Sequence, residues 1–215
     1  MRLYSLVAAF LLAVCLGAPA FAQEAAASAQ PAVAASVEEL PELTGMSGRA
    51  LELGHQLTSA QGFAGIVAST LSDHVTDFPK EWTRSPEGFG KRFASEAGQF
   101  LITKTIEFGV SALHHEDPRY FRMPLASTRQ RLGHAVVSAF VARKSDGSGS
   151  TVALGHLAGA YSSWYIAQAW EPRSATGAEQ FFLWGTANMV TKTFSNTFRE
   201  FWPDAKRKLF PHRIN

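Results

Sequence analysis

Large apolar residues recur three and four positions apart through most of this 215-residue chain, and they almost never alternate with polar residues. Spacing of this kind places apolar side chains on one face of an α-helix, whereas strict alternation indicates a half-buried β-strand. The pattern therefore predicts an all-α fold and argues against a β-sandwich or barrel. We expect a single bundle-like domain of about five helices that pack tightly through small residues.

Start and stop signals bound the predicted helices. Ser85, Pro86 and Glu87 supply an N-cap, a proline for the first helical position and an acid for the first turn. Ser127 with Gln130, and Thr176 with Glu179, have the spacing of capping boxes. Glycine and proline clusters supply the stops. The predicted helices cover residues 47–76, 86–113, 128 to just before Asp146, 152–170, and Gly177 to Trp202.

The N-terminus has the layout of a secretory signal peptide. Arg2 precedes an apolar run from Leu6 to Leu16, and Ala20-Phe21-Ala22 forms an A-x-A cleavage site. The run is shorter than the roughly 20 residues that span a bilayer. We therefore predict export, with cleavage after Ala22.

Cleavage after Ala22 removes Cys15, which is the chain's single cysteine. The mature chain would then contain no disulfide, and papain-like or cysteine-ligated zinc chemistry is excluded. Lipidation of Cys15 is the alternative, but Val14 stands where a lipoprotein signal carries a small residue.

Residues 23–44 are rich in Ala, Gln, Ser and Pro and poor in large apolar residues, a composition typical of a flexible linker. Residues 45–215 remain as the predicted helical domain. The charge of the mature chain is nearly balanced. The full chain has 20 lysines and arginines and 18 acidic residues, and cleavage of the signal peptide removes Arg2. We therefore expect no nucleic-acid partner. The C-terminus is locally basic and would either contact anionic lipid or remain a solvated tail. Its basic residues are Lys206, Arg207, Lys208 and Arg213.

The segment 152–170 contains no charged residue and approaches the length of a bilayer span. Polar residues such as His156 are costly in lipid, which favours a buried central helix over a membrane-spanning one. A stripe of small residues would let a neighbouring helix approach closely. This stripe consists of Gly155, Gly159, Ser162 and Ser163.

The densest polar cluster lies in the loop from His114 to Arg122, between two predicted helices. Candidate catalytic residues in this loop are His115, Glu116, Asp117, Arg119 and Tyr120, and candidate metal ligands are His114, His115 and Asp117. A zinc-binding H-E-x-x-H motif is absent. The structural interpretation is that Asp117 caps a turn, that the arginines pair with acids, and that Tyr120 and Phe121 anchor the loop. We predict no cofactor, because neither a phosphate-binding loop nor a G-x-S-x-G elbow is present.

Three stretches carry a resemblance to a known family. His115–Phe121 reads HEDPRYF, Gly155 and Gly159 form a G-x-x-x-G pair, and Glu200–Asp204 reads EFWPD. Over roughly residues 60–210 the chain resembles a family of exported bacterial proteins of unknown function. The resemblance implies an exported helical domain and implies no activity, cofactor or catalytic residue.

Two functions are consistent with these features. The first is a non-catalytic exported envelope protein, periplasmic or membrane-associated, that acts through helix packing or binding. Its partner would be a membrane surface, another envelope protein or a second copy of the chain. The alternative is a small periplasmic hydrolase or metal-dependent enzyme, with Glu116 or Asp117 as base and Arg119 as anion holder.

Overall fold

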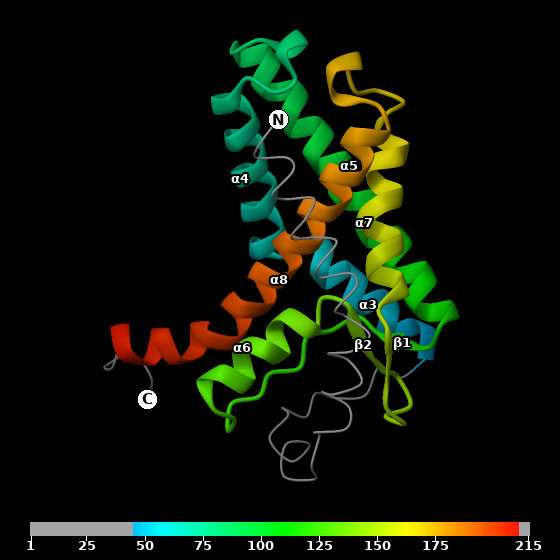
Figure 1. Cartoon of the computed structure of the whole chain (residues 1–215), viewed down its shortest axis with the longest axis vertical. Coiled ribbons are helices and arrows are strands. Elements are labelled where there is room, and N and C mark those ends of the chain that lie inside the picture. Colours follow the sequence, from blue (N-terminus) through cyan, green and yellow to red (C-terminus); the bar gives the residue numbers. More distant parts are fainter. Residues whose placement is uncertain (1–44, 211–215) are drawn as a thin grey trace.

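The computed structural model describes residues 45–210, which fold into six α-helices, two 3-10 turns and a three-stranded antiparallel sheet in the order β1-β2-β3 (Figure 1). The α-helices are α3 (Gly45–Leu57), α4 (Ala60–Thr76), α5 (Pro86–Leu113), α6 (Thr128–Val137), α7 (Leu154–Ala167) and α8 (Ala178–Leu209). The strands are β1 (Glu116–Asp117), β2 (Val141–Lys144) and β3 (Ser150–Val152), and the 3-10 turns are Lys80–Trp82 and Arg173–Ala175. The prediction of a mostly helical fold is confirmed. The predicted signal peptide, the linker and Arg213 lie outside the described residues.

Helices α5, α7 and α8 form the centre of the fold, and α7 lies along α5 (Figure 1). Gly155 and Gly159 make this close approach possible. A Cβ atom at Gly155 would lie 2.0 Å from Ser111 Oγ, and one at Gly159 would lie 2.7 Å from the Thr103 carbonyl oxygen. Ser163 is also buried, whereas Ser162 is half-buried. The small-residue stripe of α7 thus brings the two helix backbones together.

Gly159→Ala should lower the free energy of unfolding by roughly 1–3 kcal/mol, because the added methyl group meets a backbone carbonyl that cannot turn aside. Gly65→Ala is the matched control, because a Cβ at Gly65 in α4 meets nothing within 4 Å. The control should be neutral or slightly stabilising, because alanine favours a helix over glycine. Urea denaturation of both variants measures the difference, and an equal midpoint for the two would contradict close packing at Gly159.

The helix predicted over 47–76 is two helices. The chain breaks at Thr58 and Ser59, and the Ser59 hydroxyl caps α4 by accepting a hydrogen bond from the Gly62 amide at 3.0 Å. The apolar stripe expected in the core is also largely at the surface of α4, where Leu71 and Val75 are exposed. Helical periodicity identified the helix but not which side of it faces the protein.

A β-hairpin replaces the predicted end of the third helix and the start of the fourth. Helix α6 ends at Val137, and β2 and β3 follow with Ala142 paired to Thr151. The fourth helix therefore begins at Leu154 rather than Val152 and ends at Ala167. The strands contain two to four residues each, too few for alternation to be visible in the sequence.

Helix α8 begins within one residue of its predicted start but is longer than predicted at its C-terminal end. It begins after Gly177 without a side-chain cap, so the predicted capping box at Thr176 is wrong. It also continues past Pro203 to Leu209. The Asp204 carboxylate lies 2.7 Å from the Arg131 side chain of α6, and this ion pair holds the helical turn after Pro203 against α6. This tertiary contact offsets the backbone hydrogen bond that proline removes.

The interior contains charged side chains beside its apolar ones, and the surface is rich in large apolar side chains. Arg92, Glu107, Glu116 and Glu200 are almost completely buried, whereas Phe63, Tyr165, Phe182 and Phe194 are exposed. Among the aromatic side chains around the turn between α7 and α8, Trp164 is buried, whereas Tyr165, Trp170 and Phe182 are exposed. None of the helices in residues 45–210 is both long enough and apolar enough to cross a bilayer.

Candidate functional site

Glu116 lies in β1 and its carboxylate caps the N-terminus of α7. Its Oε1 accepts a hydrogen bond from the Leu154 amide at 3.1 Å, and its Oε2 accepts one from the Gly155 amide at 3.0 Å. Negative charge is favourable at this end of a helix. The Glu116 carbonyl oxygen also accepts a bond from Arg49 of α3 at 2.8 Å. Glu116 therefore joins α3, β1 and α7.

Asp117 and Arg119 bind one another. The Asp117 carboxylate accepts bonds from the Arg119 backbone amide at 3.0 Å, from Nε at 3.0 Å and from Nη2 at 2.7 Å. The guanidinium carbon of Arg119 also lies 5.6 Å from the centre of the Phe121 ring, on which Arg143 of β2 stacks at 5.1 Å. These contacts stabilise the turn around Pro118, and they pair the Asp117 carboxylate with the Arg119 guanidinium.

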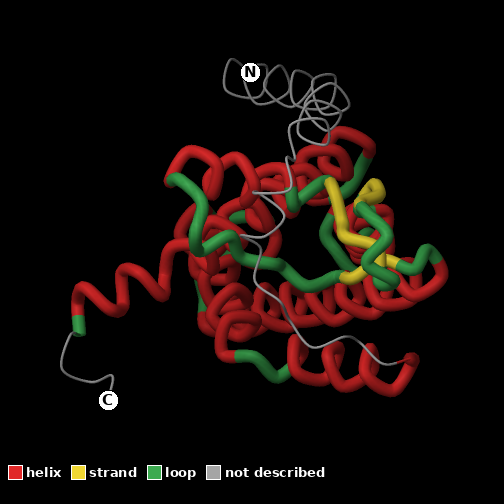
Figure 2. Tube along the Cα trace, turned by 90° about the horizontal axis from the view of Figure 1, so that it is seen from below, coloured by secondary structure: helices red, strands yellow, loops and turns green. Residues whose placement is uncertain are grey.

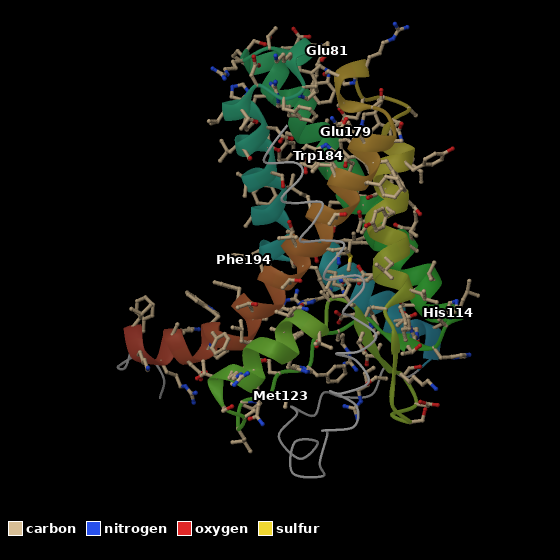
Figure 3. The ribbon with its side chains drawn as sticks, in the orientation of Figure 1. Glu81, His114, Met123, Glu179, Trp184 and Phe194 are labelled. Carbon is tan, nitrogen blue, oxygen red and sulfur yellow. The ribbon has the colours of Figure 1, made fainter. Side chains whose placement is uncertain are left out.

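His114 lies at the exposed end of α5 (Figure 3), and His115, which follows it, is also exposed. His115 has a positive φ of 55°, and its carbonyl oxygen accepts a hydrogen bond from the Ser145 amide at 2.8 Å. Asp117, by contrast, is buried and points into its contact with Arg119. Within residues 45–210 no three His, Cys, Asp or Glu side chains are arranged to hold a metal ion.

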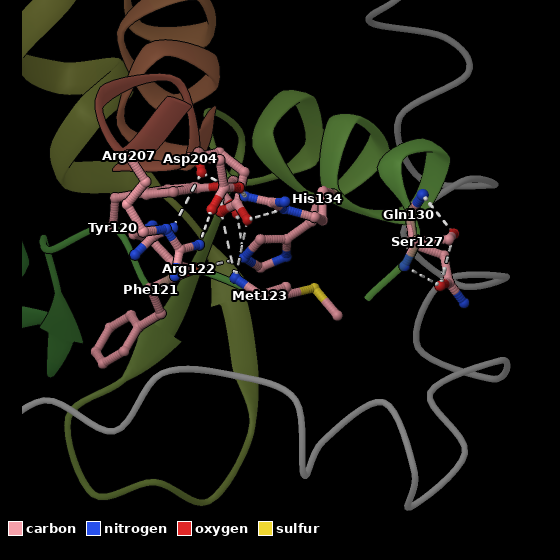
Figure 4. Close-up of polar contacts among 12 residues, drawn as sticks. Tyr120, Phe121, Arg122, Met123, Ser127, Gln130, His134, Asp204 and Arg207 are labelled. Carbon is pink, nitrogen blue, oxygen red and sulfur yellow. Dashed lines mark hydrogen bonds and ion pairs between the residues drawn. The ribbon is translucent and has the colours of Figure 1, made fainter. Parts of the chain in front are cut away.

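Tyr120, which Figure 4 labels, lies at the other end of the loop, and its hydroxyl contacts Glu200 of α8. The Tyr120 hydroxyl donates a hydrogen bond to Glu200 Oε2 at 2.7 Å, and the Met123 amide donates to both carboxylate oxygens at 3.2 Å. Arg131 of α6 completes the set, with Nε 2.7 Å from Glu200 Oε1. Burial and the neighbouring Glu200 carboxylate raise the pKa of Tyr120 far above its ordinary value.

Arg131 ties this cluster to the end of α8. Its Nη2 donates to the Glu200 carbonyl oxygen at 2.6 Å and pairs with Asp204 at 2.7 Å, and its guanidinium stacks 4.6 Å from the centre of the Phe201 ring. The HEDPRYF and EFWPD stretches, about 80 residues apart, therefore meet beside α6, where Tyr120 and Arg131 both contact the buried Glu200. In this cluster every charged group has a partner, so its role is to hold α6 and the loop against α8.

A second buried cluster, which the sequence did not predict, lies between α5, α7 and α8. At its centre is Glu107, with Lys104 Nζ 2.8 Å away, His156 Nδ1 2.5 Å away and Lys192 Nζ 3.9 Å away. Each of these residues lies on a helix, and a single charged residue in a helical sequence is normally expected to face the solvent. Only the uncharged surroundings of His156 on α7 could have indicated that one of these residues faces the interior.

The cluster has unusual protonation equilibria. Burial by itself would raise the pKa of Glu107, but His156, Lys104 and Lys192 together hold it well below its ordinary value. Burial lowers the pKa of His156 to about 4, and Lys192 adds to this shift. Burial likewise lowers the pKa of Lys192 to about 7, against the attraction of Glu107. Near neutral pH, Glu107 is therefore ionised and His156 is neutral.

A third cluster gathers three carboxyl groups around a small cavity next to the turn at Pro79. Asp73 of α4, Glu96 of α5 and Glu171, which follows α7, line this cavity, which has room for no more than about one water molecule. Arg92 closes one side and donates hydrogen bonds to the carbonyl oxygens of Phe78, Pro79 and Thr83 at 2.7, 2.9 and 2.6 Å. Its charge is thereby held beside the acids.

These carboxyl groups retain protons at unusually high pH. Burial raises the pKa of Asp73 to about 6, although Arg92 opposes the shift. Burial also raises the pKa of Glu96 to about 8, and the Asp73 and Glu171 carboxylates add to the effect. Asp73 and Glu96 hydrogen bond to one another, so one proton is shared between them near neutral pH.

Comparison with protein-family models, with curated proteins and with solved structures found no match for this chain.

Proposed function

We propose that this chain is a non-catalytic exported envelope protein that acts by binding through its surface. The observation that carries the proposal is the number of large apolar side chains that the fold leaves exposed. Each of these side chains keeps more than a third of its surface accessible in the fold. Large exposed apolar patches are uncommon on monomeric soluble proteins and mark sites of association. Such side chains occur on α3, α4, α5, α6, α7 and α8.

The polar loop supports the same proposal. Glu116 caps α7 and Asp117 binds Arg119, so neither carboxylate is free to act as a base without dismantling the fold around it. A hydrolase built on this loop would also need an accessible Tyr120 or Arg119, and Tyr120 is buried against Glu200. The contacts favour binding over catalysis for this protein.

Fractionation of cells that express the full chain tests the envelope location. We expect a processed chain that begins at Gln23 in the periplasmic or membrane fraction, and we expect a matched chain without residues 2–22 to remain in the cytoplasm. Edman sequencing or mass spectrometry identifies the N-terminus, and a carbonate wash separates peripheral from integral association. An unprocessed full chain in the cytoplasm would contradict the proposal.

A further inference from the structure

Helix α8 carries an exposed apolar stripe along its second half. Val190, Phe194, Phe198 and Trp202 follow one another at intervals of four and are all exposed, with Leu209 in the last turns. Figure 3 shows Phe194 on the side of α8 away from α7. Phe198 and Trp202 stack on each other, with 5.0 Å between ring centres. The stripe lies opposite the side of α8 that buries Met189, Asn196 and Glu200.

Helix α4 carries a matching stripe made of Phe63, Leu71 and Val75, all exposed. The two helices meet where Gln61 Nε2 donates to Ser195 Oγ at 2.7 Å and Arg199 Nε donates to Gln61 Oε1 at 3.0 Å. At about 100° per residue, these contacts lie roughly a quarter turn from the stripe on each helix. The helices run in opposite directions (Figure 1), so both stripes face the same side of the molecule.

We call this combined surface the apolar face, formed by Phe63, Leu71, Val75, Val190, Phe194, Phe198, Trp202 and Leu209. Basic side chains border it. Arg199, Lys206 and Lys208 are exposed, and within residues 45–210 neither Lys206 nor Lys208 forms an ion pair. Figure 2 shows that the last turns of α8, which carry these lysines, extend away from the other helices. The lysines are therefore free to approach a large, flat, negatively charged surface.

We propose that the apolar face lies on an anionic lipid bilayer, with Phe194, Phe198 and Trp202 entering the interfacial region and Lys206 and Lys208 contacting the headgroups. Phenylalanine and tryptophan on one side of a helix with lysines beside them is the composition of helices that lie in the plane of a membrane. The charge of the lysines favours anionic lipid over a neutral surface. This inference rests on the envelope location proposed above.

Flotation of the purified full-length mature chain with lipid vesicles tests the proposal. Vesicles of phosphatidylcholine with about one third phosphatidylglycerol should carry the protein to the top of the gradient, and pure phosphatidylcholine vesicles should bind it at least about tenfold more weakly. Phe194→Ser/Leu209→Ser should weaken binding by about tenfold or more, because less apolar surface leaves water. Leu113→Ser/Tyr165→Ser is the matched control, since these side chains are 80% and 70% exposed on α5 and α7. It should bind like the unchanged chain.

A separate pair of variants tests the contribution of the lysine charges to vesicle binding. Lys206→Glu/Lys208→Glu should reduce binding to the anionic vesicles by more than about tenfold, whereas Lys144→Glu/Arg173→Glu, which changes the same charges at exposed positions elsewhere, should not. Circular dichroism should show equal helix content for all four variants, because every altered side chain is exposed.

Equal binding to neutral and anionic vesicles would overturn the role of the lysines, and no binding to either would overturn the proposal as a whole. Analytical ultracentrifugation tests the alternative that a second copy of the chain covers the apolar face. The proposal would be overturned in favour of this alternative if the protein did not bind vesicles but formed dimers that Phe194→Ser/Leu209→Ser abolished. The vesicle experiment uses purified protein, so its failure is distinguishable from failure of the envelope location, which is measured in cells.

Discussion

Glu200→Ala is expected to lower the free energy of unfolding by about 3–5 kcal/mol, a large fraction of the 5–15 kcal/mol that stabilises a typical domain. The Glu200 side chain is completely buried and is the common partner of Tyr120, Met123 and Arg131. Its removal leaves the Arg131 guanidinium and the Tyr120 hydroxyl in the interior without the acceptor that compensates their lost hydration. We expect α6 and the loop before it to separate from α8.

Thermal denaturation and urea unfolding of the Glu200→Ala variant measure this loss, and loss of the native fold at 37 °C is the extreme form of the same result. Glu179→Ala is the control, because Glu179 is an exposed carboxylate in the first turn of the same helix and its removal should cost less than about 1 kcal/mol. Equal stability of the two variants would mean that the buried cluster does not hold α6 against α8.

Glu96→Gln is expected to stabilise the protein at alkaline pH and to have little effect at pH 5. Asp73 and Glu96 have folded-state pKa values of about 6 and about 8, against ordinary values of 3.8 and 4.5. In the folded state they keep protons that the unfolded chain has already released, so their contribution to the free energy of unfolding falls as the pH rises from about 4 to about 8. Glutamine stays neutral throughout and can still donate a hydrogen bond to Asp73.

The measurement is the free energy of unfolding in urea at pH 5, 7 and 9 for the unchanged chain and for Glu96→Gln. We expect the variant to be about 2–4 kcal/mol more stable at pH 9 and equal at pH 5. The difference between the two proteins is the quantity to compare, because Lys192, with its pKa lowered to about 7, titrates in an overlapping range with the opposite sign. A difference that stays constant from pH 5 to pH 9 would show that Glu96 is not protonated in the folded state.

Glu179→Gln serves as the control and should leave the pH profile unchanged, because that carboxylate is exposed.

The signals that predicted the fold correctly act over a few residues. Ser85 accepts the bond from the Gly88 amide at 3.0 Å and begins α5, and Ser127 and Gln130 form the predicted capping box of α6. The same kind of reasoning placed the start of α8 within one residue but assigned a capping box at Thr176 that does not form. It failed at Pro203, where the helix continues and Asp204 pairs with Arg131 of α6. The hairpin between α6 and α7 was not predicted, because its strands are too short for the alternation of apolar and polar residues to be visible in the sequence.

The candidate site was identified in the sequence as a polar loop, but not by what its residues contact. Glu116 caps a helix that begins 38 positions later, and Tyr120 meets a carboxylate 80 positions away. The structural interpretation of the loop anticipated a turn at Asp117 and arginines paired with acids such as Glu116. Arg119 pairs with Asp117 instead, and Arg122 donates to the Glu200 carbonyl oxygen at 3.2 Å. The buried sets around Glu107 and Glu96 were not anticipated, because single charges on amphipathic helices give no indication that they face inward.

The sequence by itself determined that the chain is helical and where most helices begin, because caps and apolar periodicity depend on residues within one turn of each other. Only the tertiary structure decided which side of each helix is buried. It placed Glu107, Glu116 and Glu200 inside and left Leu71, Phe194 and Trp202 outside. The physical reason is that a charge can be buried when distant residues supply its partners, and an apolar stripe stays exposed when no other element covers it.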